Sequence, residues 1–281
     1  FYFYYFRSPA GRRSIDSIIE QVAAAGIRGS DLGNLVVPVP EISRQQAIAE
    51  VLRALDDKIQ ANRNAVTTAE ELASTSVTAG IQITTLGVVA VINRKLVSTA
   101  SFAGRDVEHF SIAAFDVNQM PVVESGDRIK SGKFLLESAS VLVSKLNPHI
   151  RRVWMAEPTG TKPAITSTEF IALLPAADYP VEALWAVCSS PAFSSQLVEM
   201  VKGTTGSHQR VAPEDVLTVN IPDPRTLGQR AIEAITAEVQ ATVVLRRESA
   251  CLASLRDALL PRLFSGEVRV REAEDLVAEV V

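Results

Sequence analysis

The feature of this sequence that most constrains its fold is an internal repeat. Residues 31–40 read Asp-Leu-Gly-Asn-Leu-Val-Val-Pro-Val-Pro, and residues 215–224 read Asp-Val-Leu-Thr-Val-Asn-Ile-Pro-Asp-Pro. A repeat with a fixed offset indicates one structural unit that is used twice. The two segments are offset by 184 residues, and the same offset relates Gln45 to Gln229 and Ala47 to Ala231. Ser8-Pro9 matches Ser190-Pro191 at an offset of 182 residues.

The repeat predicts how the chain is divided. We expect residues 1–40 to be the C-terminal remnant of a first domain, in a chain that is truncated at its N-terminus, and residues 79–221 to be a complete second copy. Each copy should continue into a long helix, at 41–78 and 222–266, and residues 267–281 form an acidic tail. The charge of that tail predicts a solvated, partly frayed end.

Heptad spacing supports the two helices. In the first helix the apolar residues alternate in steps of four and three with Asn62 among them, which is typical of a seam that packs on another helix. Ser43 with Gln46, and Thr226 with Gln229, suit helix starts. The alternative is two ordinary amphipathic core helices. The residues that we expect to pair the helices are Ile48, Leu52, Leu55, Ile59, Ile232, Ile235, Val239 and Val243.

The region between the helices is predicted to be a mixed domain of strands and helices. Short runs rich in β-forming residues alternate with turn residues, and residues 181–201 have a helical pattern. The fold class is therefore α+β, with one complete α/β domain and a pair of long antiparallel helices. The expected strands are 86–92, 134–136, 141–146, 153–156 and 170–174.

Composition excludes several classes of protein. No apolar run approaches the roughly 18 residues that span a bilayer. Cys188 and Cys251 are expected to be reduced packing residues, and the three histidines have no metal-ligand spacing. Motifs for a phosphate-binding loop, a dinucleotide site, a zinc protease or a serine nucleophile are absent. The sequence thus predicts no catalytic residue, no metal and no cofactor.

Positive charge is concentrated locally although the net charge is -4. Residues 128–162 hold seven Lys and Arg against two Glu. Lysine and arginine contact phosphates, and such a patch can be hidden in the net charge of a whole chain. The bases are Arg128, Lys130, Lys133, Lys145, Arg151, Arg152 and Lys162, with Asn147 and His149 among them.

A polar loop precedes the second Pro-x-Pro segment. Its glycines, hydroxyls, amide and cations can contact phosphates and read base edges, whereas the alternative is a solvated turn. The loop residues expected to contact DNA are Lys202, Thr204, Thr205, Ser207, His208, Gln209 and Arg210.

The repeated helix entry resembles the DNA-specificity (S) subunit of type I restriction-modification enzymes. The pattern is a Pro-x-Pro, then Gln five residues on and Ile three beyond, and it occurs twice, at 38–48 and 222–232. Segments 140–148, 167–170 and 203–210 resemble the body of a target-recognition domain in that family, and 255–267 resembles its distal helix end.

The resemblance implies a non-catalytic subunit. In that family, target-recognition domains read a split DNA sequence, and two helices set their separation and dock modification subunits. The implied partners are double-stranded DNA, DNA methyltransferase subunits and, through the complex, the restriction and translocase subunit, in the cytoplasm. Self-association through the helices is a further expectation. The alternative function is a coiled-coil scaffold or dimerisation module that has lost DNA binding.

Overall fold

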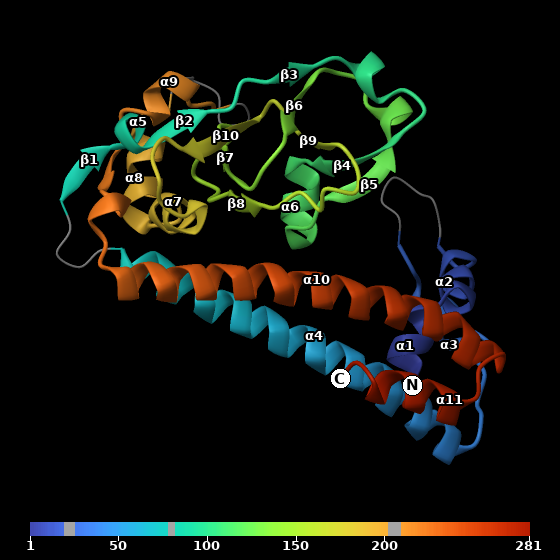
Figure 1. Ribbon diagram of the computed structural model, residues 1–281. Coiled ribbons are helices and arrows are strands. Elements are labelled where there is room, and N and C mark those ends of the chain that lie inside the picture. The colour runs from blue at the N-terminus through green and yellow to red at the C-terminus, as the bar shows by residue number, and fades with distance from the viewer. Residues whose placement is uncertain (20–25, 78–81, 202–208) are drawn as a thin grey trace. The chain divides into compact units, whose positions relative to one another are not determined.

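The computed structural model describes residues 1–19, 26–77, 82–201 and 209–281. The chain divides into two compact units (Figure 1). Unit 1 contains residues 1–63 and 248–281, and unit 2 contains residues 64–247. Among the described residues, no helix is at once long enough and apolar enough to cross a membrane.

Two sheets form the body of unit 2. The four-stranded sheet has the order β2-β10-β7-β8, and the five-stranded sheet has the order β3-β6-β9-β4-β5. All neighbours are antiparallel except β4 and β9. The strands are β2 (Ala90–Ile92), β3 (Leu96–Val97), β4 (Asp106–Phe110), β5 (Val122–Ser125), β6 (Lys133–Leu136), β7 (Ser140–Ser144), β8 (Val153–Ala156), β9 (Ala164–Thr166) and β10 (Phe170–Pro175).

Apolar side chains from both sheets form one of the hydrophobic cores in unit 2. Phe110 of β4, Trp154 of β8 and Phe170 of β10 belong to one buried cluster. The ring centroids of Phe110 and Trp154 lie 4.9 Å apart. This packing joins the two sheets, because aromatic side chains bury a large area at little entropic cost.

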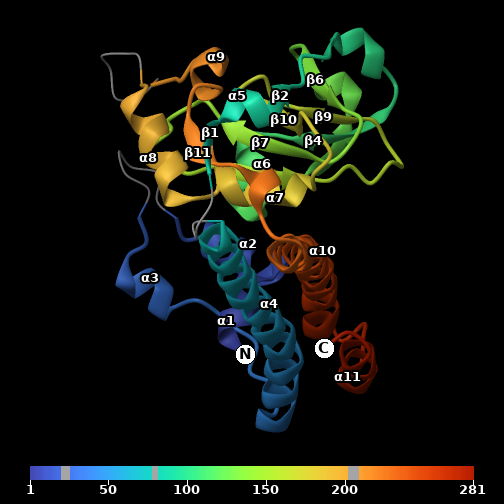
Figure 2. The same cartoon turned by 60° about the vertical axis from the view of Figure 1, so that its left-hand side comes forward.

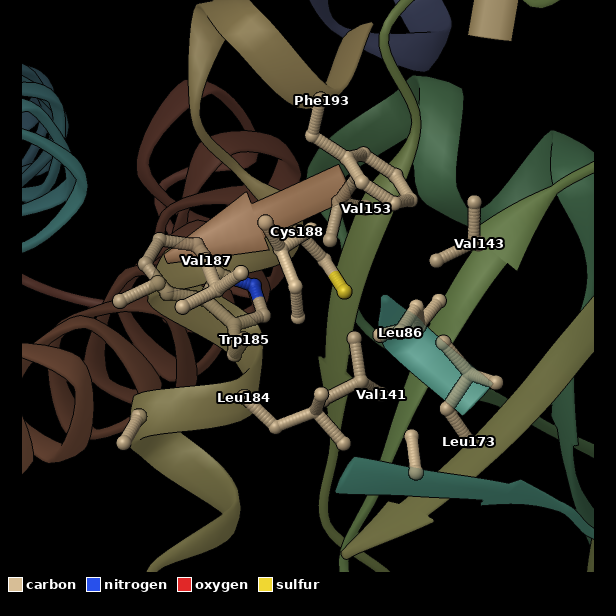
Figure 3. Packing of buried hydrophobic residues seen from close by; sticks show 14 of the residues in the cluster. Leu86, Val141, Val143, Val153, Leu173, Leu184, Trp185, Val187, Cys188 and Phe193 are labelled. Carbon is tan, nitrogen blue, oxygen red and sulfur yellow. The ribbon is translucent and has the colours of Figure 1, made fainter. Parts of the chain in front are cut away.

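Helices α7 (Val181–Cys188) and α8 (Pro191–Glu199) supply another core, on the four-stranded sheet. Trp185 and Phe193 pack among Val141, Val143 and Leu173 of the strands (Figure 3). The predicted helix over 181–201 is thus two helices. The break lies where the hydroxyl of Ser190 accepts the amide of Phe193 and Pro191 begins a new helix.

A short pair of strands closes the body of unit 2. Strand β1 (Ile83–Thr85) pairs antiparallel with β11 (Asn220–Pro222), so the two ends of the body lie side by side (Figure 2). The amide of Leu86 donates to the carbonyl of Val219 over 2.9 Å, and Asp223 donates to Gln82 over 2.7 Å.

Short helices complete unit 2: α5 (Leu86–Val89), α6 (Ile112–Asn118) and α9 (Pro213–Val216), with 3-10 turns η1 (Thr99–Phe102), η2 (Gly126–Arg128) and η3 (Pro224–Thr226). The predicted strand over 86–92 is wrong in its first half. Gly87 lies in α5, where its amide donates to the carbonyl of Leu217, and only residues 90–92 form a strand.

The two predicted long helices are confirmed as α4 (Ile42–Ser76) and α10 (Gln229–Ser265). In unit 1 they run antiparallel. Arg256 donates to the carboxylate of Asp56, and the side-chain amide of Asn62, six residues after Asp56, donates to the carboxylate of Glu248, eight residues before Arg256. Helix α4 begins one residue before Ser43, so the expected capping box is absent. Instead the side-chain amide of Gln45 donates to the backbone carbonyl of Pro40 over 2.8 Å.

Unit 1 contains four further helices: α1 (Tyr2–Arg7), α2 (Pro9–Asp16), α3 (Gly29–Gly33) and α11 (Val270–Ala278). The expectation of a frayed acidic tail is wrong. Ala273 and Val277 of α11 are buried in the same cluster as Leu55 of α4 and Leu259 of α10. Their spacing of four residues puts both on one helix face, which packs while the charges stay outside.

The repeated Ser-Pro pairs form matching helix corners. Ser8 ends α1 and caps α2, with its hydroxyl accepting the amide of Gly11, as Ser190 accepts from Phe193 between α7 and α8. In both corners the proline is the first residue of the second helix. The corner in unit 1 requires Gly11, because a Cβ there would lie 2.1 Å from the carbonyl oxygen of Tyr5.

Candidate nucleic-acid interface

Three polar segments meet at one end of the four-stranded sheet. β7 ends there, and its antiparallel neighbours β8 and β10 begin there. We name this the recognition edge: residues 145–152, 167–169 and 209–211. Backbone hydrogen bonds join its segments, from Asn147 to Gln209 over 2.8 Å, from Val211 to Lys145 over 3.0 Å and from Lys145 to Glu169 over 3.0 Å.

Asn147 shapes the loop between β7 and β8. It adopts a left-handed backbone with φ of 48°, which asparagine tolerates better than most residues. Its carbonyl accepts the amide of Ile150 over 2.9 Å and closes a tight turn. Its Oδ1 is buried with no hydrogen-bond partner among the described residues. The turn leaves His149, Ile150 and Arg151 exposed at its tip.

The structure brings seven of the predicted contact residues together at the recognition edge: Lys145, Asn147, His149, Arg151, Arg152, Gln209 and Arg210. Lys145 and Asn147 lie on the loop that follows β7, and Gln209 and Arg210 lie on the segment beside it. Leu146 and Arg210 form an isolated antiparallel bridge. Two segments about sixty residues apart, both selected for their polar side chains, thus share one surface.

Carboxylates already engage two of the arginines. Arg210 contacts both oxygens of Glu169 at 3.1 and 3.3 Å, and this hydrogen bonding raises its pKa. Arg152 holds Asp116 of α6 at 2.6 and 2.9 Å, and its side chain is only 9% exposed. Asp116 therefore neutralises the charge of Arg152 within unit 2, and the contact of Arg152 with DNA stays a prediction.

Arg151 and Lys145 differ from Arg152. Arg151 is exposed and donates one hydrogen bond, over 2.9 Å, to the carbonyl of Ser189. A carbonyl neutralises no charge, so the guanidinium keeps its positive charge and its remaining donors. Lys145 is half-buried and shows no ion pair among the described residues. These two residues provide the accessible positive charge of the recognition edge.

Of the other predicted contact residues, five fall outside the described residues: Lys202, Thr204, Thr205, Ser207 and His208. Lys162 lies in the connection between β8 and β9, away from the recognition edge in sequence and sheet.

Lys133, one of the bases of 128–162, is buried. Its ammonium donates to the carbonyl and hydroxyl of Ser131, and burial lowers its pKa. It is therefore not available to phosphate.

The eight residues selected for helix pairing divide between two cores. Four of them, Ile48, Leu52, Leu55 and Ile59, are buried in unit 1 together with Leu252, Leu259 and Leu263 of α10. In unit 2, Ile235 and Val239 are buried in a cluster that includes Ala73, and Ile232 and Val243 pack against it. Thr242 of the same helix was not among the selected positions, but it is also fully buried.

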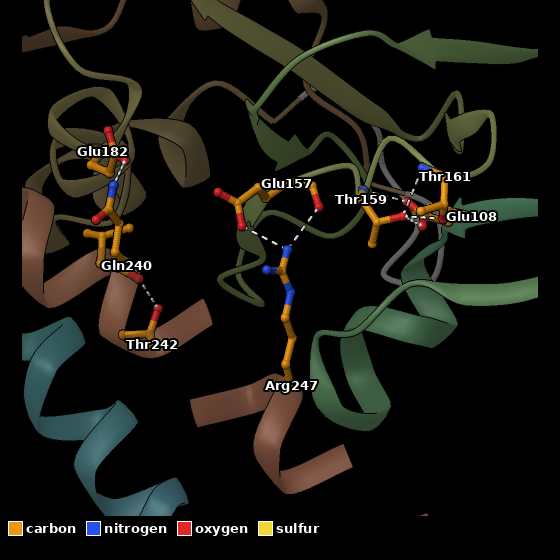
Figure 4. A network of polar contacts seen from close by, with 9 residues as sticks. Glu108, Glu157, Thr159, Thr161, Glu182, Gln240, Thr242 and Arg247 are labelled. Carbon is orange, nitrogen blue, oxygen red and sulfur yellow. Dashed lines mark hydrogen bonds and ion pairs between the residues drawn. The ribbon is translucent and has the colours of Figure 1, made fainter. Parts of the chain in front are cut away.

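Polar contacts attach α10 to the sheets of unit 2. Arg247 donates to a carboxylate oxygen of Glu157 over 2.8 Å, and Gln240 donates to Glu182 over 3.1 Å (Figure 4). The turn that follows Glu157 is also held in place, because the backbone amide of Thr159 donates to the carboxylate of the buried Glu108 over 3.0 Å. Arg246 of α10 forms an ion pair with Glu70 of α4, within the part of both helices that belongs to unit 2.

The residues that the sequence did not reveal are the acidic partners. Glu169 is 41 residues from Arg210 and Asp116 is 36 residues from Arg152, so no local spacing marks either pair. Among the described residues, no group of three His, Cys, Asp or Glu side chains is arranged to hold a metal ion.

Comparison with known proteins gives a result at the level of fold. No protein-family profile matches the chain, and no curated sequence matches it. The type I restriction-modification S subunit from M. genitalium is similar in structure, with a TM-score of 0.56 and 16% identity over 92% of this chain and 71% of that one.

Two further solved structures cover 95% of this chain and 70% of theirs at 17% identity. One is the HsdS subunit from Thermoanaerobacter tengcongensis, with a TM-score of 0.36, and the other concerns assembly and conformational transition of the type I R-M system, with a TM-score of 0.40. Since both scores are low, the fold assignment depends on the first structure. Its long helix pair and mixed sheets correspond to those described above, and the chain has the fold of the S subunit of type I restriction-modification systems.

Proposed function

We propose that this chain is a non-catalytic subunit that recognises a DNA sequence and directs the methyltransferase and restriction subunits of a type I restriction-modification complex to it. The observation that carries the proposal is the recognition edge. It gathers amide, imidazole and cationic side chains from separate segments on a chain with the S-subunit fold.

The recognition edge has the two kinds of group that reading DNA requires. Arg151 and Lys145 supply charge for phosphates, which positions a duplex without selecting its sequence. Asn147 and Gln209 lie beside them, and asparagine or glutamine amides can pair with adenine in the major groove. The rigid sheet end holds these side chains, which reduces the entropy lost when DNA binds.

The long helices are the proposed docking elements. We assign residues 41–78 and 222–266 to this role, residues 79–221 to the complete recognition domain and residues 1–40 to the remnant of a second one. Support comes from the matching helix corners at Ser8 and Ser190. The charged outer faces of α4 and α10 are the surfaces on which a methyltransferase subunit would bind.

One observation favours the second candidate, a coiled-coil scaffold without DNA binding. Two of the arginines at or next to the recognition edge, Arg152 and Arg210, are occupied by carboxylates. In that case the helix pairing in unit 1 would be the functional part, and the duplex would bind weakly or not at all.

Salt-dependent duplex binding separates the candidates. Affinity is measured by fluorescence anisotropy on random-sequence duplexes between about 50 and 200 mM salt, with the wild type and with Lys145→Gln/Arg151→Gln. Each phosphate contact contributes about 0.9 to the slope of log affinity against log salt. We expect the double variant to bind more weakly at every salt concentration, with a slope lower by one to two.

Lys95→Gln/Arg94→Gln is the matched control, because it removes two exposed cations of unit 2 that lie outside the recognition edge. It should retain the wild-type slope. Equal losses in both double variants would show nonspecific attraction, and no wild-type binding would favour the scaffold.

A further inference from the structure

The segment Leu35–Pro40 of unit 1 lacks the cover that its counterpart in unit 2 has. In the repeat, Leu35 and Val37 correspond to Val219 and Ile221. Val219 and Ile221 are 0% and 1% exposed, because β11 pairs with β1 and faces the core. Leu35 and Val37 are only half-buried, although they are equally apolar.

Several backbone groups of the same segment also have no backbone partner among the described residues. Val36, Val37 and Val39 donate no backbone hydrogen bond to any described residue, and the carbonyls of Gly33 and Leu35 accept none. The side chains of Val36 and Val39 are 88% and 74% exposed. An extended segment with free donors and acceptors and apolar side chains can accept a further strand.

Unit 2 shows which atoms such a strand would use. Three hydrogen bonds flank the pairing of β1 with β11: Leu86 amide to Val219 carbonyl at 2.9 Å, Gly87 amide to Leu217 carbonyl at 2.8 Å, and Asp223 amide to Gln82 carbonyl at 2.7 Å. The counterparts of these three β11-side groups are the carbonyls of Leu35 and Gly33 and the amide of Val39. All three counterparts are without a backbone partner among the described residues.

A cavity beside the segment provides room for an apolar side chain. It has a volume of about 460 Å³, and its lining includes Ile18, Ile19, Leu35 and Val36. Three of their counterparts in unit 2, Met200, Val201 and Val219, belong to or pack against the apolar cluster in which Leu86, the residue after β1, is fully buried. The cavity thus lies where the repeat places the leucine that follows the strand.

We infer that the segment Leu35–Pro40 binds an extended strand with the chemistry of β1, two or three β-branched residues followed by leucine, in antiparallel register. The strand pairs with Val37 and Val39, and the leucine enters the cavity beside Leu35. The pairing follows from the internal repeat and is independent of DNA binding.

The test uses the full chain with a second copy of residues 82–91 joined to its N-terminus by a flexible linker of about 20 residues. The hydroxyl of Tyr2 donates to the carbonyl of Pro38 over 3.3 Å, so the N-terminus lies close to the segment. Tethering gives an effective concentration in the millimolar range, which makes a weak strand addition measurable. Hydrogen exchange of the Val37 and Val39 amides should slow by about tenfold or more.

Two variants of the tethered copy provide the control. Because residues 82 and 86 bond to β11, Thr84 also faces it, whereas the amide of Thr85 points away. Thr84→Pro should remove the protection and Thr85→Pro should retain most of it. Unchanged exchange at Val37 and Val39 in the fusion would overturn the inference. So would protection that is equal in the two proline variants, or a tethered strand that displaces β1 and changes only the Ile221 amide.

Discussion

The cysteines show how differently one residue type is placed in this chain. Cys188 of α7 is fully buried among apolar side chains, and burial raises the pKa of its thiol. Cys251 lies exposed on α10, where the sequence predicted packing. Exposure and thiolate formation control the reactivity of a thiol, so the two should react at very different rates.

A thiol-reactive dye at pH 8 should therefore modify one cysteine per native chain and both in denaturant. We expect Cys251→Ser to abolish native labelling and Cys188→Ser to leave it unchanged. Rapid labelling of native Cys251→Ser would mean that the core around α7 opens readily.

Asp223, which follows β11 at the end of the body of unit 2, makes the stability of the fold depend on pH in acid. It is buried, and hydrogen bonds from the side chain of Arg225, at 2.6 and 2.9 Å, hold its pKa below the usual range. A lowered pKa means that the folded state binds a proton less readily than the unfolded state does. The stabilisation is present above the unfolded pKa of about 3.9 and is lost as pH falls through the folded pKa.

Asp223→Asn, which cannot titrate, should therefore lose less stability than the wild type between about pH 4 and pH 2. The urea midpoint of each protein is measured at several pH values, and the difference between the two midpoints is compared across pH. Asp178→Asn offers a control carboxylate. Parallel pH curves for wild type and Asp223→Asn would contradict the assignment.

At the scale of elements, apolar periodicity was informative and polar partners were not. The heptad positions of α4 follow from a period of 3.5, because burial on one face selects that spacing. The strand runs at 153–156 and 170–174 are short apolar runs of β-forming residues without alternation, which is typical of strands that are buried on both faces. Residues 86–89 were misread as strand, since a short apolar run has no distinctive period. The acidic tail was misread because its charges outnumber the two buried positions of α11.

The candidate site divides in the same way. The sequence indicated which loops carry polar side chains, and two of them do meet at the recognition edge. The carboxylates that occupy Arg152 and Arg210 come from α6 and from the turn before β10. Those contacts depend on how strands pair, and a single sequence does not contain that information in any local spacing.

The helix contact in unit 1 can be tested at Leu55, which is fully buried between α4 and α10. Leu55→Asp loses the apolar contact and buries an unpaired carboxylate, which should cost about 3 kcal/mol or more. Ala61→Asp changes an exposed position of the same helix and should cost about 0.7 kcal/mol. The comparison is made from urea midpoints and ellipticity at 222 nm, and equal losses in the two variants would refute the contact.

At the scale of the whole molecule, the body of unit 2 is inserted into the chain at a single point. Thr85 pairs with Asn220, so the body between them enters and leaves at neighbouring positions. Helix α10 contacts this body through Ile235 and Val239, which are buried in the same apolar cluster as α7 and the strands, and through polar contacts with Glu157 and Glu182. The body is therefore expected to be exchangeable as a unit.

Replacing residues 86–219 by the corresponding body of another protein with this fold should transfer its duplex preference. The graft keeps acidic residues at the positions of Glu157 and Glu182. The preference is measured by selecting bound duplexes from a random pool. The free energy of unfolding of unit 1, obtained from urea titration, should change by less than about 1 kcal/mol. An unchanged preference in a folded graft would place DNA reading outside the body.

The β1–β11 pair also has a consequence for the order of folding. Its two strands are separated by the whole body, so pairing them first would require closing a very long loop for only three residue pairs. The body is therefore expected to fold before the pair can form, and during synthesis β1 stays unpaired until β11 has left the ribosome. β1 has only three residues and two of them are threonines, Thr84 and Thr85. A short, polar strand is a poor template for aggregation while it is unpaired.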